Sequence, residues 1–221
     1  MLEIKGLVKS FHSRRVIDHL DLHAGRGEII HIKGQNGCGK STLFKIICDI
    51  LDKDEGMIHL DDGVKIGALI ENPGFLENRT LKENLRYLFS LTRSTVDETH
   101  LRELCKFFFL DLEEKSKMKA YSVGMRQKAG IIQAVMEGQD LILFDEPTRG
   151  LDEESVGRFG ELVTQLANDG KCVVIASHDT LDNIIFTSRY RMDGGKLRES
   201  ARGDALEADG AGSADHGLAF L

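Results

Sequence analysis

The chain has 221 residues, a formal net charge of -7 and 41% hydrophobic residues. This length suits one domain, or one core domain with a small inserted subdomain. The acidic balance gives no support to nucleic-acid binding. No apolar run approaches the ~20 residues that a membrane-spanning helix needs, and the first residues lack the apolar core of a signal peptide. We therefore expect a cytoplasmic protein that binds no nucleic acid.

The first 70 residues predict strands around a single helix. Residues 1–11 and 14–24 alternate apolar and polar side chains, which is typical of antiparallel strands. Residues 27–34 read as a buried strand that runs into a glycine-rich loop. Residues 40–51 predict a helix whose apolar face holds Leu43, Ile46, Ile47 and Ile50. Residues 56–70 predict two strands around an Asp-Gly turn.

The middle of the chain is helical, and the last third alternates strand and helix. Residues 80–91 open with Thr80 and Glu83 at the spacing of a capping box, and residues 97–110 form a second amphipathic helix. Helices are then predicted at 124–138 and 153–169, and buried strands at 141–147 and 171–179. Such alternation predicts an α/β fold with a mostly parallel sheet.

The stretch "GQNGCGKST" matches the phosphate-loop pattern G-x-x-x-x-G-K-[ST] through Gly34, Gly39, Lys40 and Ser41. A predicted strand precedes it and a predicted helix follows it, as the motif requires. Glycines let main-chain N–H groups cradle a polyphosphate at the positive end of a helix. We expect Lys40 to reach the β- and γ-phosphates and Ser41 to ligate Mg²⁺. The residues expected to bind ATP in this loop are Gly34, Gln35, Asn36, Gly37, Cys38, Gly39, Lys40, Ser41 and Thr42.

The stretch "LILFDEP" leaves two carboxylates at the end of a buried strand. Ligands of open α/β sheets bind at the carboxyl ends of the strands. Asp145 is therefore a candidate to hold Mg²⁺, and Glu146 is a candidate general base for the attacking water.

Between these motifs lies "YSVGMRQKAG", in which Ser122, Gly124 and Gln127 resemble the LSGGQ-type signature of ATP-binding cassette (ABC) ATPases. The resemblance covers roughly residues 1–198. It implies a P-loop NTPase core, an N-terminal antiparallel β subdomain and an inserted α-helical subdomain at about residues 72–130. Residues 199–221 are rich in acidic residues, Gly and Ala, and we expect them to form a flexible tail.

The resemblance to ABC ATPases also implies roles for single residues. Phe11 would stack on adenine, residues 150–152 would form the D-loop, and His178 would contact the γ-phosphate. The expected catalytic residues are then Lys40, Glu146 and His178, with ATP and Mg²⁺ bound. Two ATPase domains, as a homodimer or pseudo-dimer, would face each other head to tail. Ser122 and Gly124 of one copy would close on the γ-phosphate held by the other.

Two positions depart from the usual family pattern. Glu71 stands where a glutamine is usual, and it would add a negative charge to the Mg²⁺ and ATP site. This glutamate and the stretch "ENPGFLEN" that it begins resemble the bacitracin- and lantibiotic-resistance branch of ABC transporter ATPases. Val123 replaces the first of two usual glycines and adds bulk beside the phosphate site.

The interpretation that follows is the ATPase subunit of an ABC transporter, with Mg²⁺ held by Ser41, Glu71 and Asp145. An integral membrane permease would be a separate polypeptide, and the subunit would lie on the inner face of the membrane through that permease. The branch implies export of peptide antibiotics or related compounds. Two alternatives stay open: a soluble ABC ATPase that transports nothing, and a nucleotide-gated switch with low turnover.

Overall fold

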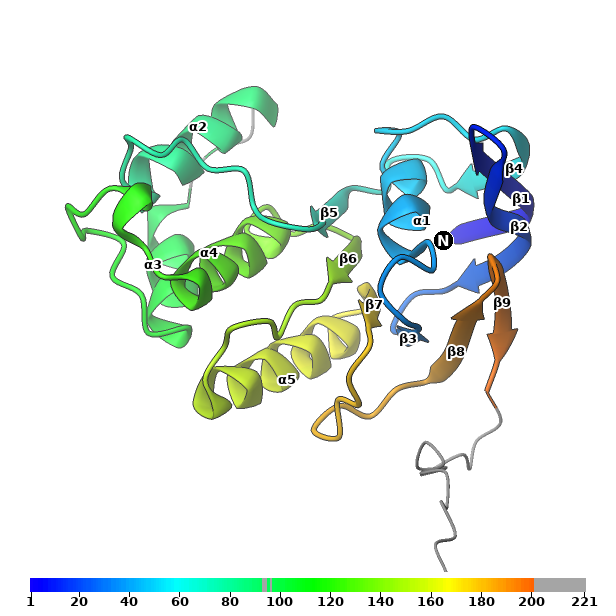
Figure 1. Ribbon diagram of the computed structural model, residues 1–221. Helices are drawn as coiled ribbons and strands as arrows, with labels where there is room; N and C mark the ends of the chain where they lie inside the picture. The colour runs from blue at the N-terminus through cyan, green and yellow to red at the C-terminus, as the bar shows by residue number, and fades with distance from the viewer. Residues whose placement is uncertain (93–94, 96, 201–221) are drawn as a thin grey trace, which may run out of the picture.

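The computed structural model describes residues 1–92, 95 and 97–200. A three-stranded antiparallel sheet, in the order β2-β1-β4, contains the N-terminal strand and lies on the right in Figure 1. Its strands are β1 (Leu2–Phe11), β2 (Arg14–Ala24) and β4 (Glu55–Leu60). The predicted antiparallel pairing of the first two strands is confirmed, since Leu2 pairs with Ala24 and Phe11 with Arg14.

A second, six-stranded sheet has the order β5-β6-β7-β3-β8-β9. Its strands are β3 (Ile29–Lys33), β5 (Ile66–Leu69), β6 (Leu141–Asp145), β7 (Cys172–Ser177), β8 (Ser188–Asp193) and β9 (Lys196–Glu199). Neighbours pair in parallel except β8 and β9, which form an antiparallel hairpin. The predicted α/β fold with a mostly parallel sheet is therefore confirmed.

The helices form where the sequence places caps and apolar faces. They are α1 (Lys40–Ile47), α2 (Leu81–Thr92), α3 (Glu98–Phe107), a 3₁₀ turn at Met118–Ala120, α4 (Val123–Val135) and α5 (Glu153–Asn168). The capping box at α2 is present, because Thr80 and Glu83 exchange hydrogen bonds between their backbone N–H groups and side chains. No helix among the described residues is long and apolar enough to span a bilayer.

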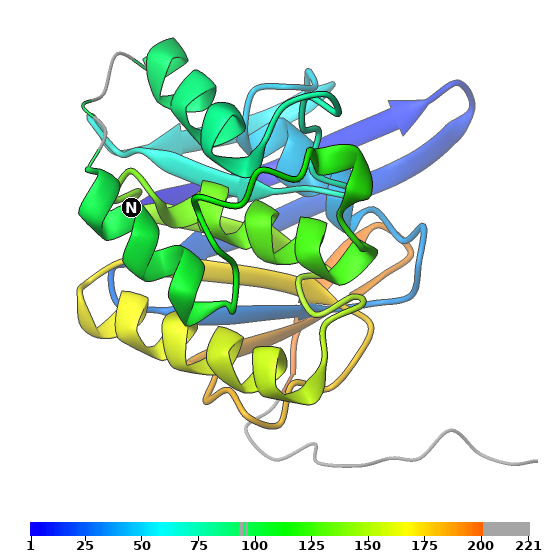
Figure 2. The same ribbon diagram turned by 90° about the vertical axis from the view of Figure 1, so that its left-hand side faces the viewer.

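The parallel sheet has a hydrophobic core on each face, and β6 shows how the sequence supplies both. Leu141 and Leu143 pack with α1 and the antiparallel sheet, whereas Ile142 and Phe144 pack with α4 and α5. Alternate residues of a strand point to opposite faces, so a fully apolar strand fills two cores at once. Figure 2 shows α4 and α5 lying along the same face of the sheet.

Some expectations were wrong in detail. The first helix ends at Ile47, and Ile50 lies beyond it with 67% of its surface exposed. The two strands around the Asp-Gly turn exist, but they belong to different sheets and do not pair with each other. The sequence reading also missed the β8–β9 hairpin. Glu199, predicted to begin the tail, belongs to β9, and residues 201–221 of that tail lie outside the described residues.

One glycine sets how closely α4 approaches the edge strand β5. A Cβ added at Gly67 would overlap the carbonyl oxygen of Ala134, which is helix backbone. Backbone cannot move aside as a flexible side-chain end can, so a larger residue at this position must push the helix from the sheet. By contrast, a Cβ at Gly157 of α5 would meet open space.

We predict that Gly67→Ala lowers the free energy of unfolding by about 1–3 kcal/mol, the usual cost of overpacking a core. Gly157→Ala is the matched control. It should be neutral or stabilising by up to about 1 kcal/mol, because alanine favours a helix interior more than glycine does. Urea unfolding followed by circular dichroism measures both. Equal stabilities for the two variants would contradict this account of the α4–β5 contact.

Candidate nucleotide-binding site

The predicted phosphate loop joins the end of β3 to the start of α1, and its backbone explains its glycines. Gly37 and Gly39 have φ values of 78° and 115°, which side-chain-bearing residues rarely adopt. A Cβ at Gly34 would lie 2.7 Å from the Cys38 sulfur and 2.8 Å from the carbonyl oxygen of Met192. Gly34 therefore lacks room for a side chain, whereas Gly37 and Gly39 are required by their backbone conformations.

Lys40 lies inside this loop. Its side chain is 5% exposed, and its Nζ donates to the carbonyl oxygens of Gly34 at 2.6 Å and Gln35 at 3.2 Å. The same Nζ is 3.4 Å from Oε1 of Glu146. A buried ammonium needs such acceptors, and phosphate oxygens arriving in the loop would serve it equally well.

Ser41 and Asp145 meet although 104 positions separate them. The Ser41 hydroxyl donates to Oδ2 of Asp145 at 2.5 Å, and Asp145 is 3% exposed. Burial raises the pKa of Asp145 and the charge of Glu146 raises it further, while the Ser41 hydrogen bond and the Lys40 charge lower it. A hydroxyl and a carboxylate side by side are the hard oxygen ligands that Mg²⁺ prefers, so these residues fit that ion.

Glu146 and His178 form a second pair beside the loop. His178 Nδ1 lies 2.8 Å from Oε2 of Glu146. The other carboxylate oxygen, Oε1, is buried and accepts no hydrogen bond within the described structure. Glu146 has a φ of 48°, a conformation that costs an L-residue about 1–2 kcal/mol. An unfilled buried acceptor held by a strained backbone can take a proton from a water molecule.

The signature residues lie on α4 and stay apart from the phosphate loop in the single chain. Ser122 caps α4 by accepting from the Met125 N–H at 3.2 Å. Gly124 packs against the carbonyl oxygen of Gly150, and a Cβ there would overlap it. Among the residues that the structure describes, no hydrogen bond or ion pair joins Ser122 or Gly124 to residues 34–42. The signature residues and the phosphate loop are therefore separate in the single chain.

Phe11 and Glu71 lie at the margins of the site. Phe11 ends β1, is 42% exposed, and has the Lys9 ammonium 5.6 Å from its ring centroid. Glu71 has a φ of 57°, and its carboxylate pairs with Lys45 Nζ at 2.6 Å. The Glu71 carboxylate is therefore paired with Lys45, which lies four residues after Ser41 on α1.

The sequence reading missed two partners of these residues. Lys45 lies four positions after Ser41, so helical spacing already places both on one face of α1. Gln127 was read only as part of the signature, yet its Nε2 donates to the carbonyl oxygens of Glu146 at 2.9 Å and Pro147 at 3.1 Å. Gln127 therefore connects the signature helix to the end of β6.

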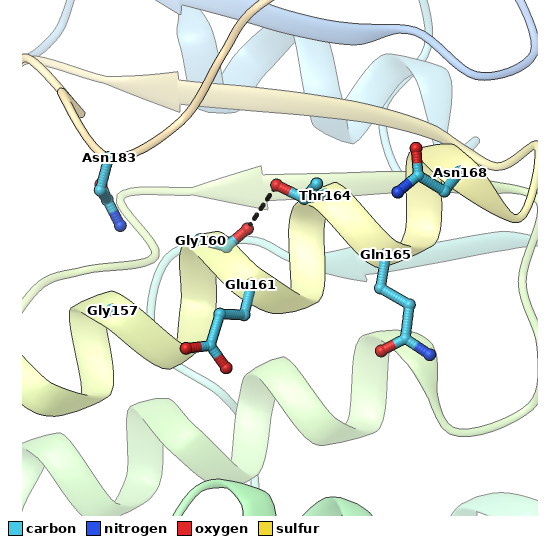
Figure 3. A pocket seen from close by; sticks show the side chains of 7 residues that line it. All are labelled: Gly157, Gly160, Glu161, Thr164, Gln165, Asn168 and Asn183. Carbon is cyan, nitrogen blue, oxygen red and sulfur yellow. Dashed lines mark hydrogen bonds between the residues drawn. The ribbon is translucent and has the colours of Figure 1, made fainter.

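A separate hollow lies on α5 and the Asn183 loop (Figure 3). Its labelled residues include Gly160, whose carbonyl accepts from the Thr164 hydroxyl. None of the lining residues is among those predicted to bind nucleotide, so this hollow is not the predicted site.

Comparisons with known proteins agree with the geometry. The family described as ABC transporter matches residues 17–149. A lantibiotic transport ATP-binding protein, SrtF of Streptococcus pyogenes, is 30% identical over 185 residues, which cover 80% of each chain. The bacitracin transport ATP-binding protein BcrA of Enterococcus faecalis is also 30% identical, over 80% of this chain and 61% of its own length.

A solved structure of an ATP-binding subunit of an ABC transporter superposes with a TM-score of 0.83 and 26% identity, covering 92% of this chain and 91% of the other. The resemblance inferred from the motifs, including that to the bacitracin and lantibiotic branch, is thereby confirmed. The chain belongs to the ABC transporter family, as an ATP-binding and ATP-hydrolysing subunit that drives transport.

Proposed function

We propose that this subunit energises a separate integral membrane permease that exports peptide antibiotics or related amphipathic compounds. The observation that carries the proposal is the assembly of Lys40, Ser41, Asp145 and Glu146 at one edge of the parallel sheet. The cargo class is supported by the similarity to SrtF and BcrA, whose names specify lantibiotic and bacitracin transport. On this proposal the subunit lies at the cytoplasmic face of the membrane and docks to the permease through its α-helical subdomain, at about residues 72–130.

Binding would begin at the phosphate loop. The N–H groups of residues 34–42 and the N-terminus of α1 would hold the phosphates, with Lys40 turning from its carbonyl partners to the β- and γ-phosphate oxygens. Phe11 would provide an aromatic surface for adenine. Ser41 and Asp145 would hold Mg²⁺, and Glu71 would join them when its carboxylate leaves Lys45. The bound ion would neutralise charge on the phosphate oxygens.

Hydrolysis would use the pair beside the loop. Within the part of the chain that the structure describes, Oε1 of Glu146 accepts no hydrogen bond but lies 3.4 Å from Lys40 Nζ. Once Lys40 has turned to the phosphates, Oε1 would accept a proton from the attacking water as the water oxygen bonds to the γ-phosphorus and the bond to the β-phosphate oxygen breaks. His178, fixed by its 2.8 Å contact with Glu146, would donate to the γ-phosphate. Lys40 would stabilise the charge that develops on the transferred group.

The second half-site would come from another copy. Ser122 and the first N–H groups of α4 would meet the γ-phosphate of a facing subunit, because a helix N-terminus attracts anions. This arrangement makes two copies necessary for each complete site. Hydrolysis should therefore rise faster than in proportion to protein concentration until the dimer saturates.

We predict that Lys40→Ala and Glu146→Gln separate binding from chemistry. Lys40→Ala should weaken ATP binding by about 10- to 100-fold, since a hydrogen bond from a charged donor contributes about 1.5–3 kcal/mol. Glu146→Gln should bind ATP normally and hydrolyse it at least about 100-fold more slowly, because a general base is lost. Calorimetry and phosphate release measure the two effects. Lys53→Ala, at an exposed position outside the loop, is the control. Normal turnover by Glu146→Gln would show that Glu146 is not the base.

We predict opposite Mg²⁺ responses for the two members of the Glu71–Lys45 pair. Glu71→Gln should raise the Mg²⁺ concentration that gives half-maximal hydrolysis by roughly threefold to tenfold, because one unit charge near a cation is worth about 1 kcal/mol or more at a partly screened distance. Lys45→Met should lower that concentration, because it removes the ammonium that competes for the carboxylate. Titration of hydrolysis with Mg²⁺ measures both. Identical titrations for wild type and Glu71→Gln would remove Glu71 from the metal site.

We predict that the tagged chain co-purifies from detergent-solubilised membranes of its native host with an integral membrane protein. Loss of that protein should sensitise cells to the compounds it exports, and Glu146→Gln should do the same without breaking the complex. A matched preparation of Lys53→Ala should behave as wild type. Recovery of only cytosolic partners would favour the soluble, non-transport alternative.

A further inference from the structure

A buried histidine outside the recognised motifs lies directly behind the His178 segment. His31 occupies the middle of β3, three residues before the phosphate loop, and is 3% exposed. In the parallel pairing of β3 with β7 it lies opposite Ile175, with Ser177 two residues further along the same face. Its side chain reaches Ser177, with Nε2 2.8 Å from the hydroxyl oxygen.

The hydrogen bonds at Ser177 determine which nitrogen of His31 carries the proton. The Ser177 hydroxyl donates to the carbonyl oxygen of Asp179 at 2.9 Å, so its only hydrogen is used. The oxygen can then only accept from His31, which places the proton on Nε2. His31 therefore donates a hydrogen bond to the Ser177 hydroxyl, which in turn donates one to the Asp179 carbonyl oxygen.

The surroundings keep His31 neutral and its ring fixed. Burial, together with the nearby cations Arg189, Lys33 and Lys40, lowers the pKa of His31 to about 4. The ring stacks on Phe186 with centroids 4.6 Å apart and an interplanar angle of 19°. Arg189 covers Phe186 with its guanidinium 5.0 Å from the ring. A neutral ring held by stacking is a fixed donor.

This series of hydrogen bonds ends on the turn that carries His178. The Ser177–Asp179 bond spans His178, whose Nδ1 lies 2.8 Å from Glu146. Among the described residues, the pairing of β7 with β3 ends at Ser177, whose carbonyl oxygen accepts from the Gly34 N–H at 3.3 Å. Without the His31 donor, the Ser177 hydroxyl is free to rotate to other acceptors, and the turn loses the bond that sets its direction.

We propose that His31 is a positioning residue for ATP hydrolysis: through Ser177 it holds the turn that presents His178 to Glu146 and to the terminal phosphate. The proposal rests on the proposed function, in which His178 and Glu146 act on that phosphate. His31 makes no contact with the nucleotide on this account. It links the strand that leads into the phosphate loop to the segment that senses the γ-phosphate.

The first test compares two replacements of His31 in the full-length protein. His31→Phe keeps an aromatic ring for Phe186 but removes the donor, and should lower kcat by about tenfold with the ATP dissociation constant unchanged. His31→Gln places an amide N–H near the position of Nε2 and should keep kcat within about threefold of wild type. Steady-state phosphate release gives kcat, and calorimetry gives ATP binding.

The second test asks whether the effect passes through Ser177 and His178. Ser177→Ala should lower kcat as much as His31→Phe, and the double variant should be no slower than either single variant. In a His178→Ala background, His31→Phe should change kcat by less than about twofold. Ser177→Ala also tests the proposal if His31→Phe fails to fold.

Val173→Ala is the control for a merely structural effect. Val173 is fully buried on the same strand and face as Ser177 but lies away from the turn that carries His178. This variant should therefore lose stability and keep its kcat. A tenfold loss in Val173→Ala, or an equal loss in His31→Gln and His31→Phe, would overturn the proposal. So would independent, additive effects of His31→Phe and His178→Ala. If His31→Phe keeps full activity while His178→Ala is inactive, only the role inferred for His31 is overturned. If His178→Ala keeps full activity, the proposed role of His178 is overturned as well.

Discussion

The buried ammonium of Lys40 is the charge on which the rest of the site depends. An unpaired buried cation would cost several kcal/mol, so the fold must surround it with acceptors. Two loop carbonyls and the Glu146 carboxylate do this in the single chain. The same arrangement leaves the ammonium poised for anionic ligands, since each of these partners can be exchanged for a phosphate oxygen. The bare glycine backbone is needed because those oxygens must come close to the main chain.

Parallel strands explain how residues far apart in sequence reach that ammonium. The strands β3, β6 and β7 are neighbours, and their carboxyl ends meet at one edge of the sheet. The phosphate loop follows the first, Glu146 follows the second and His178 follows the third. The register of β6 with β7 places Asp145 opposite Ala176, so that both segments end at the same level. The apolar character of these strands thus positions polar residues that no local motif could bring together.

The sequence predicted the parts of this structure that depend on local patterns. The phosphate loop and the capping box at Thr80 are each set by residues within a few positions. It failed where long-range packing decides. Ile50 continues the apolar spacing of α1, but the helix ends at Ile47, Cys48 is its C-cap, and Asp49 has a φ of 57°. The polar, charged strands β8 and β9 carry too little apolar alternation to be seen, and they form because β8 extends the edge of the sheet beside β3.

Two contacts connect α4 to the backbone segments that follow β6 beside the candidate site. Gln127 binds the carbonyl oxygens that follow β6, and Gly124 packs on the carbonyl oxygen of Gly150. A shift of α4 would therefore displace the backbones of Glu146 and Gly150 together, because close-packed backbone contacts transmit displacement. Val123, 64% exposed, adds an apolar surface at the start of α4, where the proposed dimer would place a facing phosphate. Because Ser122 already accepts from the Met125 N–H, a phosphate in the proposed dimer would meet the N–H groups of Val123 and Gly124, the residues that begin the helix.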